Sequence, residues 1–529
     1  MDSKGTTRES LPCIIKLPSD FSVPAITEYV SELKAFLASP LVDLLVSAHP
    51  NEVAIKGQLT PTEVHDAQWW KWVGDVDPSG RAGLINALIR SAADRTIQED
   101  QEFHPSIRGL VHQVSRLRLP RALEDVHDGL SGLNGHRNSG MSPKKAHEVE
   151  RLSNLIDMIY DTSVRDPNRL IVDVGAGQGY LSRKLAEHTS TRVLALDGDE
   201  GQTEGATLRG KGLSHAERQR SRNKQDLSDE GDTDPMAPPV THRTLFITSD
   251  SLLHAMDEWI EHLDVDQRTT PRPVLITGLH ACGSLTPAVL RCFIDLYTQL
   301  NQEASNKRKW TPVALALVGC CYNLMHDSGD FPLSETTARV HPQTGLHLTQ
   351  NHLQLAAQCP AQWSRSPSEA ERASLARRKI VWRAMLARLF HNNLGGSSTN
   401  APPNRLGRLP DRVYVSWEIF VRTACEKMGL TATDTERLLI DNPLDENRSA
   451  LSSETDTLSF QLEVLHILRA LIGPVIESII IVDRAIFLAE RLGSGNGQDG
   501  FTVRVLNIFD QLSSGSARNI ALVVEPISN

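Results

Sequence analysis

The sequence lacks any uninterrupted run of about 20 apolar residues, the length that a membrane-spanning helix needs. Its most apolar stretch, residues 470–488, is interrupted by Pro474, Glu477, Asp483 and Arg484. The first ten residues are polar and have no apolar core of the kind found in a secretory signal. We therefore predict a protein without a membrane anchor, in which residues 470–488 form a buried helix.

A disulfide framework is also absent. The seven cysteines are not evenly spaced, their number is odd, and two of them, Cys320 and Cys321, are adjacent. This usage is typical of a reducing compartment, so we predict an intracellular protein, either cytoplasmic or nuclear.

Positive charge is in deficit, because 55 Lys and Arg residues stand against 65 Asp and Glu, a net charge of −10. The protein as a whole therefore has no general attraction for a nucleic-acid backbone, although a local basic patch would still have one. Aromatic residues are absent from residues 201–240, which are rich in Asp, Glu, Arg, Lys, Ser and Gly. We predict that this segment is a disordered surface insertion without a chemical role.

The length of 529 residues predicts several domains, or one domain with large insertions. Apolar segments separated by helical patterns predict a parallel sheet, with strands at residues 170–172, 192–196, 244–248, 273–277 and 313–318. Two final segments, 501–509 and 519–524, are typical of an antiparallel pair that completes the sheet. The predicted regions are an N-terminal helical region (1–130), a ligand-binding α/β domain (141–325), a helical insertion (326–500) and the closing strands (501–529).

A glycine-rich loop connects the first of these strands to a helical pattern. Glycines at Gly175, Gly177 and Gly179 allow backbone angles that a Cβ forbids, and they let a ligand lie against the main chain near the free N–H groups of the helix start. The dinucleotide fingerprint needs a third glycine where Tyr180 stands. The spacing therefore favours S-adenosylmethionine over NAD as the cofactor.

Two acidic residues extend this site. Asp173 ends the first strand and could face the positive charge of S-adenosylmethionine, whereas it would repel a pyrophosphate. Asp197 ends the second strand, about twenty residues beyond the loop, where a carboxylate can accept hydrogen bonds from both ribose hydroxyls. Upstream, Lys145 lies in a basic helix start capped by Ser142 and Pro143, and we predict that it reaches the carboxylate of the cofactor. A solvated helix start is the alternative interpretation of this basic segment.

Chemically versatile side chains follow the fourth and fifth strands, in residues 278–285 (GLHACGSL) and 319–323 (GCCYN). Because ligands bind at the carboxyl ends of parallel strands, we predict catalytic roles for His280, Cys282 and Tyr322, with His280 as a general base. Two alternatives stay open. The cysteines could fill space beneath the cofactor, or His280, Cys282, Cys320 and Cys321 could bind zinc, although the spacing is not that of a familiar zinc motif. We do not predict a metal site. The Asn/Asp-Pro-Pro-aromatic motif for amine acceptors is also absent, so the residues do not indicate a nucleobase amine.

Taken together, the motifs resemble those of the methyltransferase-like 25 family, which includes proteins named for a ribosomal RNA adenine dimethylase domain. The matching segments are residues 141–149 (MSPKKAHEV), 171–179 (IVDVGAGQG), 278–285, 318–322 (VGCCY), 471–490, 508–510 and 517–519. Two features depart from the family pattern: Ala517 replaces a proline, and the polar insertion after Asp197 is longer.

The resemblance implies an α/β fold with a Rossmann-like, seven-stranded class I methyltransferase domain, an N-terminal helical region and a large helical insertion. It also implies S-adenosylmethionine as the cofactor, held by Asp173, Gly175, Gly177, Gly179 and Asp197, with Asp250 at the adenine end. We therefore predict a methyltransferase that acts on an RNA or a protein. The alternative is a non-catalytic Rossmann-like scaffold that binds a protein or RNA partner.

Overall fold

The computed structural model describes residues 13–22, 25–59, 68–93, 103–124, 141–188, 190–210, 239–263, 270–302, 309–340, 346–393, 406–440, 452–493, 500–511 and 513–527. The chain forms two compact units. We call them the sheet unit (Met1–Ser31, Leu119–His347 and Ser478–Asn529) and the helical unit (Glu32–Arg118 and Leu348–Glu477). The predicted regions 1–130 and 326–500 each contribute to both units.

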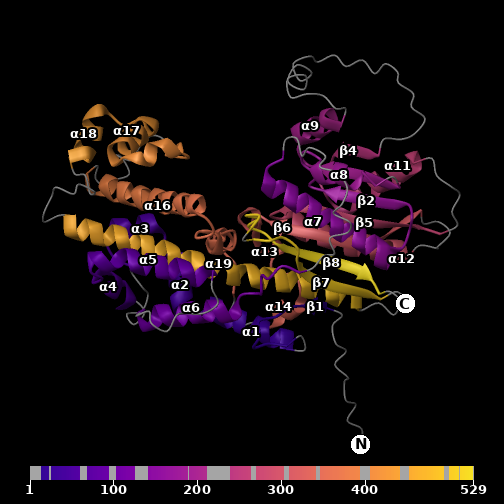
Figure 1. Ribbon diagram of the computed structural model, residues 1–529, viewed down its shortest axis with the longest axis horizontal. Helices are drawn as coiled ribbons and strands as arrows, with labels where there is room; N and C mark the ends of the chain where they lie inside the picture. Colours follow the sequence, from indigo (N-terminus) through magenta and orange to yellow (C-terminus); the bar gives the residue numbers. More distant parts are fainter. Residues whose placement is uncertain are drawn as a thin grey trace, which may run out of the picture. The chain divides into compact units, whose positions relative to one another are not determined.

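The sheet unit is built on one sheet with the strand order β1-β7-β8-β6-β5-β2-β3-β4 (Figure 1). Strands β2 to β6 run parallel, as predicted, whereas β8 is antiparallel to both of its neighbours. The strand bounds are β1 Cys13–Ile15, β2 Arg169–Val174, β3 Thr191–Asp197, β4 Val240–Thr244, β5 Arg272–Cys282, β6 Trp310–Cys320, β7 Phe501–Asn507 and β8 Ile520–Pro526.

The predicted strand count of seven is wrong, because the described sheet has eight strands. The additional strand, β1, pairs in parallel with β7 and lies in the region predicted to be helical. Three residues are too few to give a recognisable period-two pattern. The strand predicted at 244–248 is also displaced, since β4 is Val240–Thr244. Thr248 instead caps the next helix by accepting a hydrogen bond from the Ser251 N–H, at 3.1 Å.

Chain order reverses at the centre of the sheet, between β2 and β5. From β2 the chain passes to β3 and β4 on one side, and it then crosses to β5 and β6 on the other. Helices cover the sheet: α12 packs on β5 and β6, α7 on β5, and α8 on β3. The bounds in this unit are α7 Pro143–Ile159, α8 Tyr180–Leu185, α9 Glu200–Gly210, α11 Ser249–His262, α12 Leu285–Gln302, α13 Asp327–Asp330 and α14 Glu335–Arg339. This arrangement confirms the Rossmann-like fold, and in such sheets ligands bind at the carboxyl ends of the strands beside the reversal point, here β2 and β5.

The insertion predicted to be disordered begins with a helix, so that prediction is wrong for its first ten residues. Helix α9 packs on β3 and β4 and buries Ala206 completely. Asp199 stabilises its first turn by accepting a hydrogen bond from the Gln202 N–H, at 2.9 Å. The composition of the segment concealed this local capping signal. Residues 211–238 lie outside the described residues.

The helical unit combines α2 to α6 with α15 to α18, and helices α1 and α19 contribute to both units. The bounds are α1 Ile26–Leu37, α2 Pro40–Ser47, α3 Pro50–Lys56, α4 Gln68–Gly74, α5 Pro78–Ala93, α6 Pro105–Leu117, α15 Gln350–Ala356, α16 Pro367–Asn393, α17 Trp417–Met428, α18 Ala432–Ile440 and α19 Ser452–Gly493.

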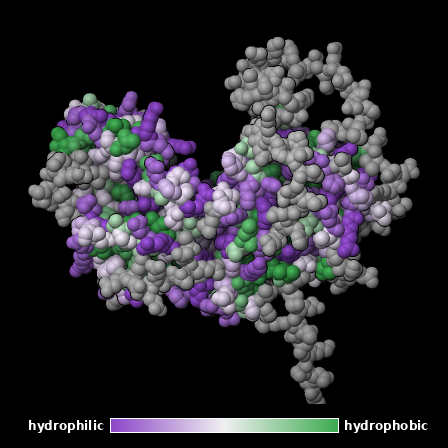
Figure 2. All heavy atoms as spheres, viewed as in Figure 1, coloured by the Kyte–Doolittle hydropathy of each residue, from purple (hydrophilic) through white to green (hydrophobic). Residues whose placement is uncertain are grey.

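Among the described helices, only α19 is long and apolar enough to cross a membrane, and 89% of its most apolar window is buried. Such burial is typical of a core helix, in agreement with the buried helix predicted at 470–488. On the outside of the helical unit, Val415, Ile419 and Ile440 are exposed around α17 and α18, where apolar residues appear at the surface in Figure 2.

Candidate functional site

The glycine loop follows β2 at the reversal point of the sheet, where its three glycines take left-handed backbone angles. The φ angles are 70° at Gly175, 53° at Gly177 and 66° at Gly179. Side chains are disfavoured at such angles, which explains why glycine occupies each position. At Gly177 an added Cβ would have no heavy atom within 4 Å, so the main chain there borders open space. The loop therefore presents bare backbone to a ligand.

Asp197 at the end of β3 holds this loop in place. Its Oδ2 accepts a hydrogen bond from the Gly177 N–H at 2.8 Å, and its Oδ1 accepts one from the Asp199 N–H at 2.9 Å. The N–H groups of Gly175 and Ala176 both donate to the carbonyl of Leu196. These three loop N–H groups are thus bonded within the protein, whereas the free N–H groups that we predicted belong to the start of α8 and stay a prediction. Each carboxylate oxygen keeps a further lone pair, so the predicted contact with ribose hydroxyls stays a prediction.

Asp173 lies at the end of β2 and is 1% exposed. Its Oδ2 accepts a hydrogen bond of 2.6 Å from the hydroxyl of Ser182, a partner in α8 that the sequence reasoning missed. Burial raises the pKa of Asp173 to about 6. The hydrogen bond from Ser182 acts in the opposite direction and lowers this pKa, whereas the negative charge of Asp197 raises it further. A nearby positive charge would stabilise the ionised form of this buried carboxylate.

The other two predicted cofactor residues occupy different surroundings. Ser142 caps α7 as predicted, since its hydroxyl accepts a hydrogen bond from the Lys145 N–H at 3.3 Å. The Lys145 ammonium lies 4.9 Å from the ring centre of Tyr180, which directly follows the loop. Asp250, in the first turn of α11, is exposed, and no contact among the described residues joins it to the loop.

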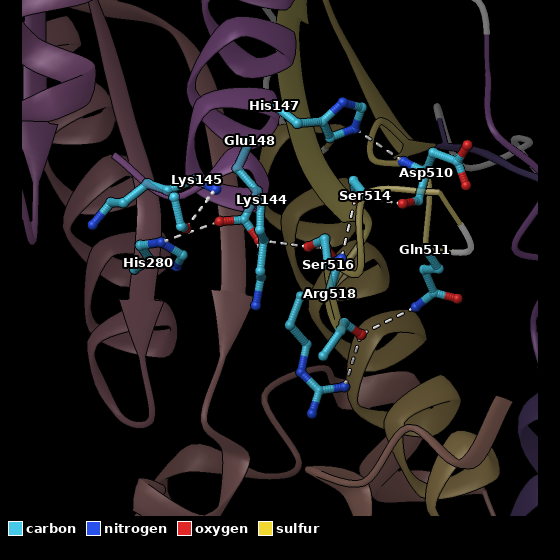
Figure 3. A network of polar contacts seen from close by, with 12 residues as sticks. Lys144, Lys145, His147, Glu148, His280, Asp510, Gln511, Ser514, Ser516 and Arg518 are labelled. Atoms are coloured by element: carbon cyan, nitrogen blue, oxygen red, sulfur yellow. Dashed lines mark hydrogen bonds and ion pairs between the residues drawn. The ribbon is translucent and has the colours of Figure 1, made fainter. Parts of the chain in front are cut away.

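His280 belongs to a polar network that joins α7, β5 and the segment between β7 and β8 (Figure 3). Its Nε2 lies 3.7 Å from Oε2 of Glu148, and the other oxygen of Glu148 accepts a hydrogen bond of 2.6 Å from Ser516. Burial lowers the pKa of His280, and the positive charges of Lys145 and Lys144 lower it further. The negative charge of Glu148 raises this pKa, but its effect is smaller than that of burial. The imidazole is therefore neutral at pH 7.

Glu148 was not among the predicted site residues. It is 4% exposed and lies four residues before Leu152, a core residue of α7. That helical spacing already placed a carboxylate on the buried face of α7, which was the available signal. A buried acid needs partners, and here they come from segments far apart in the sequence.

Three thiols converge at the ends of β5 and β6. Cys282 Sγ lies 3.1 Å from Cys320 Sγ and 3.6 Å from Cys321 Sγ. The hydrogen bond with Cys320, aided by Cys282 and by the charges of Arg518 and Lys144, lowers the pKa of Cys321 to about 6, whereas the pKa of Cys320 is raised. Cys321 is consequently poised to ionise first.

Tyr322 is 2% exposed, and two arginines lie close to its ring. The Cζ atoms of Arg484 and Arg518 lie 5.5 Å and 5.3 Å from the centre of its ring. Such stacking fixes the ring in place and links β6 to α19 and to the start of β8. The structure thus brings the predicted catalytic residues to one edge of the sheet, and their catalytic roles stay predictions.

Residues 144–328 match the family described as "Methyltransferase domain". Two curated proteins named "Probable methyltransferase-like protein 25" are also similar to this chain. The one from Mus musculus is 25% identical over 278 residues, which cover 51% of this chain and 39% of that protein. The one from Homo sapiens is 24% identical over 254 residues, which cover 47% and 36%. The resemblance to the methyltransferase-like 25 family is confirmed. The matched segments span less than two fifths of these relatives, and the matches do not show the ribosomal RNA adenine dimethylase name.

A solved structure, coclaurine N-methyltransferase bound to N-methylheliamine and SAH, is also similar to this chain. The alignment covers 95% of this chain and 98% of the coclaurine N-methyltransferase chain. Its sequence identity is 12% and its TM-score 0.18, so the likeness carries no argument about this protein.

The methyltransferase domain implies S-adenosylmethionine as the cofactor, and the residues present fit that molecule. The open space beside Gly177 is one that a side chain would fill, and Asp173 is a buried carboxylate suited to a cation. Asp197 supplies oxygens at the position where ribose hydroxyls are expected.

Cofactor binding should weaken as the pH falls below about 6, because protonation of Asp173 would remove the negative charge that we predict to face the sulfonium. The affinity should fall by up to about tenfold per pH unit over this range. Titration calorimetry between pH 5 and 8 measures the change. Asp173→Asn is the control, because the titration of any other group persists in this variant, and its profile should be flatter. An equally steep profile in the variant would assign the effect to another group.

Proposed function

We propose that this chain is an S-adenosylmethionine-dependent methyltransferase. The observation that carries the proposal is the glycine loop, fixed by the bond from the Gly177 N–H to Asp197, at the reversal point of a sheet within a matched methyltransferase domain. When bound there, the cofactor supplies a methyl group that its positive sulfur already activates. The protein then has to position the reactants and accept a proton.

The residues of the site can perform both tasks. Asp197 and the glycine loop would orient the nucleoside, and Asp173 would face the positive charge. His280 is partly exposed and has a lowered pKa, so at pH 7 its neutral ring can take a proton from the acceptor. Glu148, 3.7 Å from Nε2, would stabilise the imidazolium that forms.

We further propose that the acceptor is an RNA, held by the helical unit. This unit contains a cavity of about 490 Å³, lined by two arginines, two histidines, four amide side chains and apolar residues, without a carboxylate among the residues that line it. Its wall includes Arg469, which is 7% exposed and whose Nη1 has no hydrogen-bond partner. Burial lowers the pKa of Arg469 to about 10. Among the residues that the structure describes, no carboxylate is recorded beside this guanidinium, and a buried positive charge in such surroundings favours an anionic ligand.

The chemistry of the cavity favours a phosphate over a carboxylate from a protein. Arg383 and Arg469 supply guanidinium groups, which match phosphate oxygens well. Phe390 and Met428 supply apolar surface on which a base can pack. This local basic site is compatible with a net charge of −10, because recognition by a cavity does not require a basic protein.

The experiment that tests the proposed function has two stages. Titration calorimetry of the wild type with S-adenosylmethionine should give saturable heat, and its absence would refute the proposal. Incubation with radiolabelled cofactor and fractionated RNA or protein extracts should then place label in RNA. Label in protein would support the proposed methyltransferase activity but refute the proposal that the acceptor is an RNA. Cofactor binding without label in either fraction would support the scaffold instead.

Arg469→Met is expected to stabilise the protein while weakening RNA binding. Replacing a buried unpaired charge by an apolar side chain of similar length removes a desolvation penalty of several kcal/mol, so the melting temperature should rise. RNA affinity, measured by filter binding, should fall by about tenfold or more if Arg469 contacts phosphate. Affinity for S-adenosylmethionine should not change. The exposed Arg412→Met provides a control without either effect. Unchanged RNA affinity in Arg469→Met would exclude this cavity as the phosphate site.

A further inference from the structure

The three thiols at the ends of β5 and β6 form a cluster of metal-ligand geometry. Their sulfur atoms all lie within 4.8 Å of one another, and Cys282 Sγ lies 3.1 Å from Cys320 Sγ and 3.6 Å from Cys321 Sγ. Two thiolates bound to one tetrahedral zinc ion, at bond lengths of about 2.3 Å, lie about 3.8 Å apart. Shifts of less than about 1 Å would therefore place all three sulfurs around one ion.

The backbone of Cys321 takes a left-handed conformation, which allows its side chain to lie beside those of Cys282 and Cys320. Successive side chains of a strand point to opposite faces, so Cys320 and Cys321 would normally diverge. Cys321 instead takes φ 49° and ψ 49° as the chain leaves β6. Among the described non-glycine residues, only Arg165 and Cys321 have a positive φ. Such strain costs of order 1–3 kcal/mol and persists at sites with a function.

Three cationic side chains lie near enough to act on the cluster. Arg518 and Lys144 act on Cys321, and Arg484 acts on Cys320. Three thiolates with one divalent ion carry a net charge of −1, which these side chains would balance. Arg484 is almost fully buried, and its Nε has no hydrogen-bond partner in the structure. A permanent negative charge nearby would reduce the cost of burying it.

The geometry points to a zinc site formed by Cys282, Cys320 and Cys321, with its fourth coordination position left to water or to a substrate atom. Within the described part of the chain, no histidine or carboxylate joins this group of ligand atoms. His280, which the sequence suggested as a further ligand, has its Nε2 beside Glu148. Three protein ligands with an open position are typical of zinc sites that act on a substrate, whereas structural sites are closed.

A disulfide explains the cluster less well. Sulfur atoms in a disulfide are about 2.05 Å apart, and one bond would leave the third thiol without a role. All seven cysteines are free thiols in the structure. Zinc binding also changes the interpretation of Cys282, because a thiolate that holds a metal ion cannot serve as a general acid or base.

The test is the metal content of the full-length protein. After expression with added zinc and removal of loosely bound ions, mass spectrometry of the metals should find about one zinc ion per chain. Cys282→Ser and Cys321→Ser should reduce the content to background. Cys425→Ser, which replaces a buried free cysteine of the helical unit, should leave it unchanged. Loss of zinc in all three variants would indicate a general folding effect and refute the assignment.

Cobalt provides a second readout that does not depend on activity. The protein loaded with cobalt should show thiolate-to-metal charge-transfer absorption and the ligand-field bands of a tetrahedral ion. Addition of a small thiol should shift these bands if the fourth position is open. A chain that binds neither ion, or that carries a disulfide between two of the three cysteines when purified without reductant, would overturn the proposal.

Discussion

Gly177→Asp should reduce the affinity for S-adenosylmethionine by at least about 100-fold. An added Cβ at this position meets no heavy atom within 4 Å, so the new side chain would project into open space beside the loop instead of into the core. It would fill the predicted ligand space and place a negative charge near Asp197, whose carboxylate binds the Gly177 N–H. Titration calorimetry with the cofactor measures the loss.

The fold of Gly177→Asp should survive. Aspartate tolerates the left-handed conformation, so the strain at a φ of 53° should cost about 1 kcal/mol. Gly177→Asn has the same size without the charge, and it separates the two contributions. Gly83→Asp is the matched control, because Gly83 is exposed and an added Cβ there also meets no atom within 4 Å. Affinity equal to that of the wild type in Gly177→Asp would show that the loop does not hold the cofactor.

Asp483→Ala should destabilise the sheet unit by about 3–5 kcal/mol. Asp483 is 1% exposed in α19, and its carboxylate accepts hydrogen bonds from the Leu333 N–H (2.7 Å), the Ser334 N–H (3.0 Å) and the Ser334 hydroxyl (2.7 Å). Truncation leaves these donors without an acceptor and opens a cavity. Thermal unfolding should show a melting temperature lower by about 6–20 °C.

Two variants define this effect. Asp483→Asn keeps the volume and one acceptor oxygen, so its destabilisation should be smaller. Asp456→Ala, in the same helix, removes only an exposed ion pair with Arg81 and should cost less than about 1 kcal/mol. If Asp483→Ala unfolds at the temperature of the wild type, the carboxylate does not anchor residues 333–334.

A second acid of α19 contributes to the same anchoring. Glu490 lies on α19 and accepts hydrogen bonds of 2.8 Å from the N–H groups of Glu335 and Thr336. Together with Asp483 it holds the start of α14, which follows β6 and its cysteine pair. Asp483 explains one of the charges that interrupt the apolar stretch of α19, since its buried carboxylate has hydrogen-bond donors in residues 333–334.

Local features were predictable because their causes lie within a few neighbouring residues. The Ser142 cap, the buried face of α7 and the glycine loop each follow from a residue type at a fixed spacing. Errors arose where a local signal was short or concealed. Strand β1 has three residues, and α9 begins within a segment whose composition indicates disorder.

The sequence by itself determined the glycine loop, the acids Asp173 and Asp197 and the parallel sheet that positions them, because glycine conformation and apolar periodicity act locally. Only the tertiary structure decided the rest. It placed Glu148 between His280 and Ser516, brought Cys282 to Cys320 and Cys321, and buried Arg469 with its Nη1 lacking a hydrogen-bond partner among the described residues. These juxtapositions depend on which strands and helices become neighbours, and the spacing of residues along the chain does not specify that.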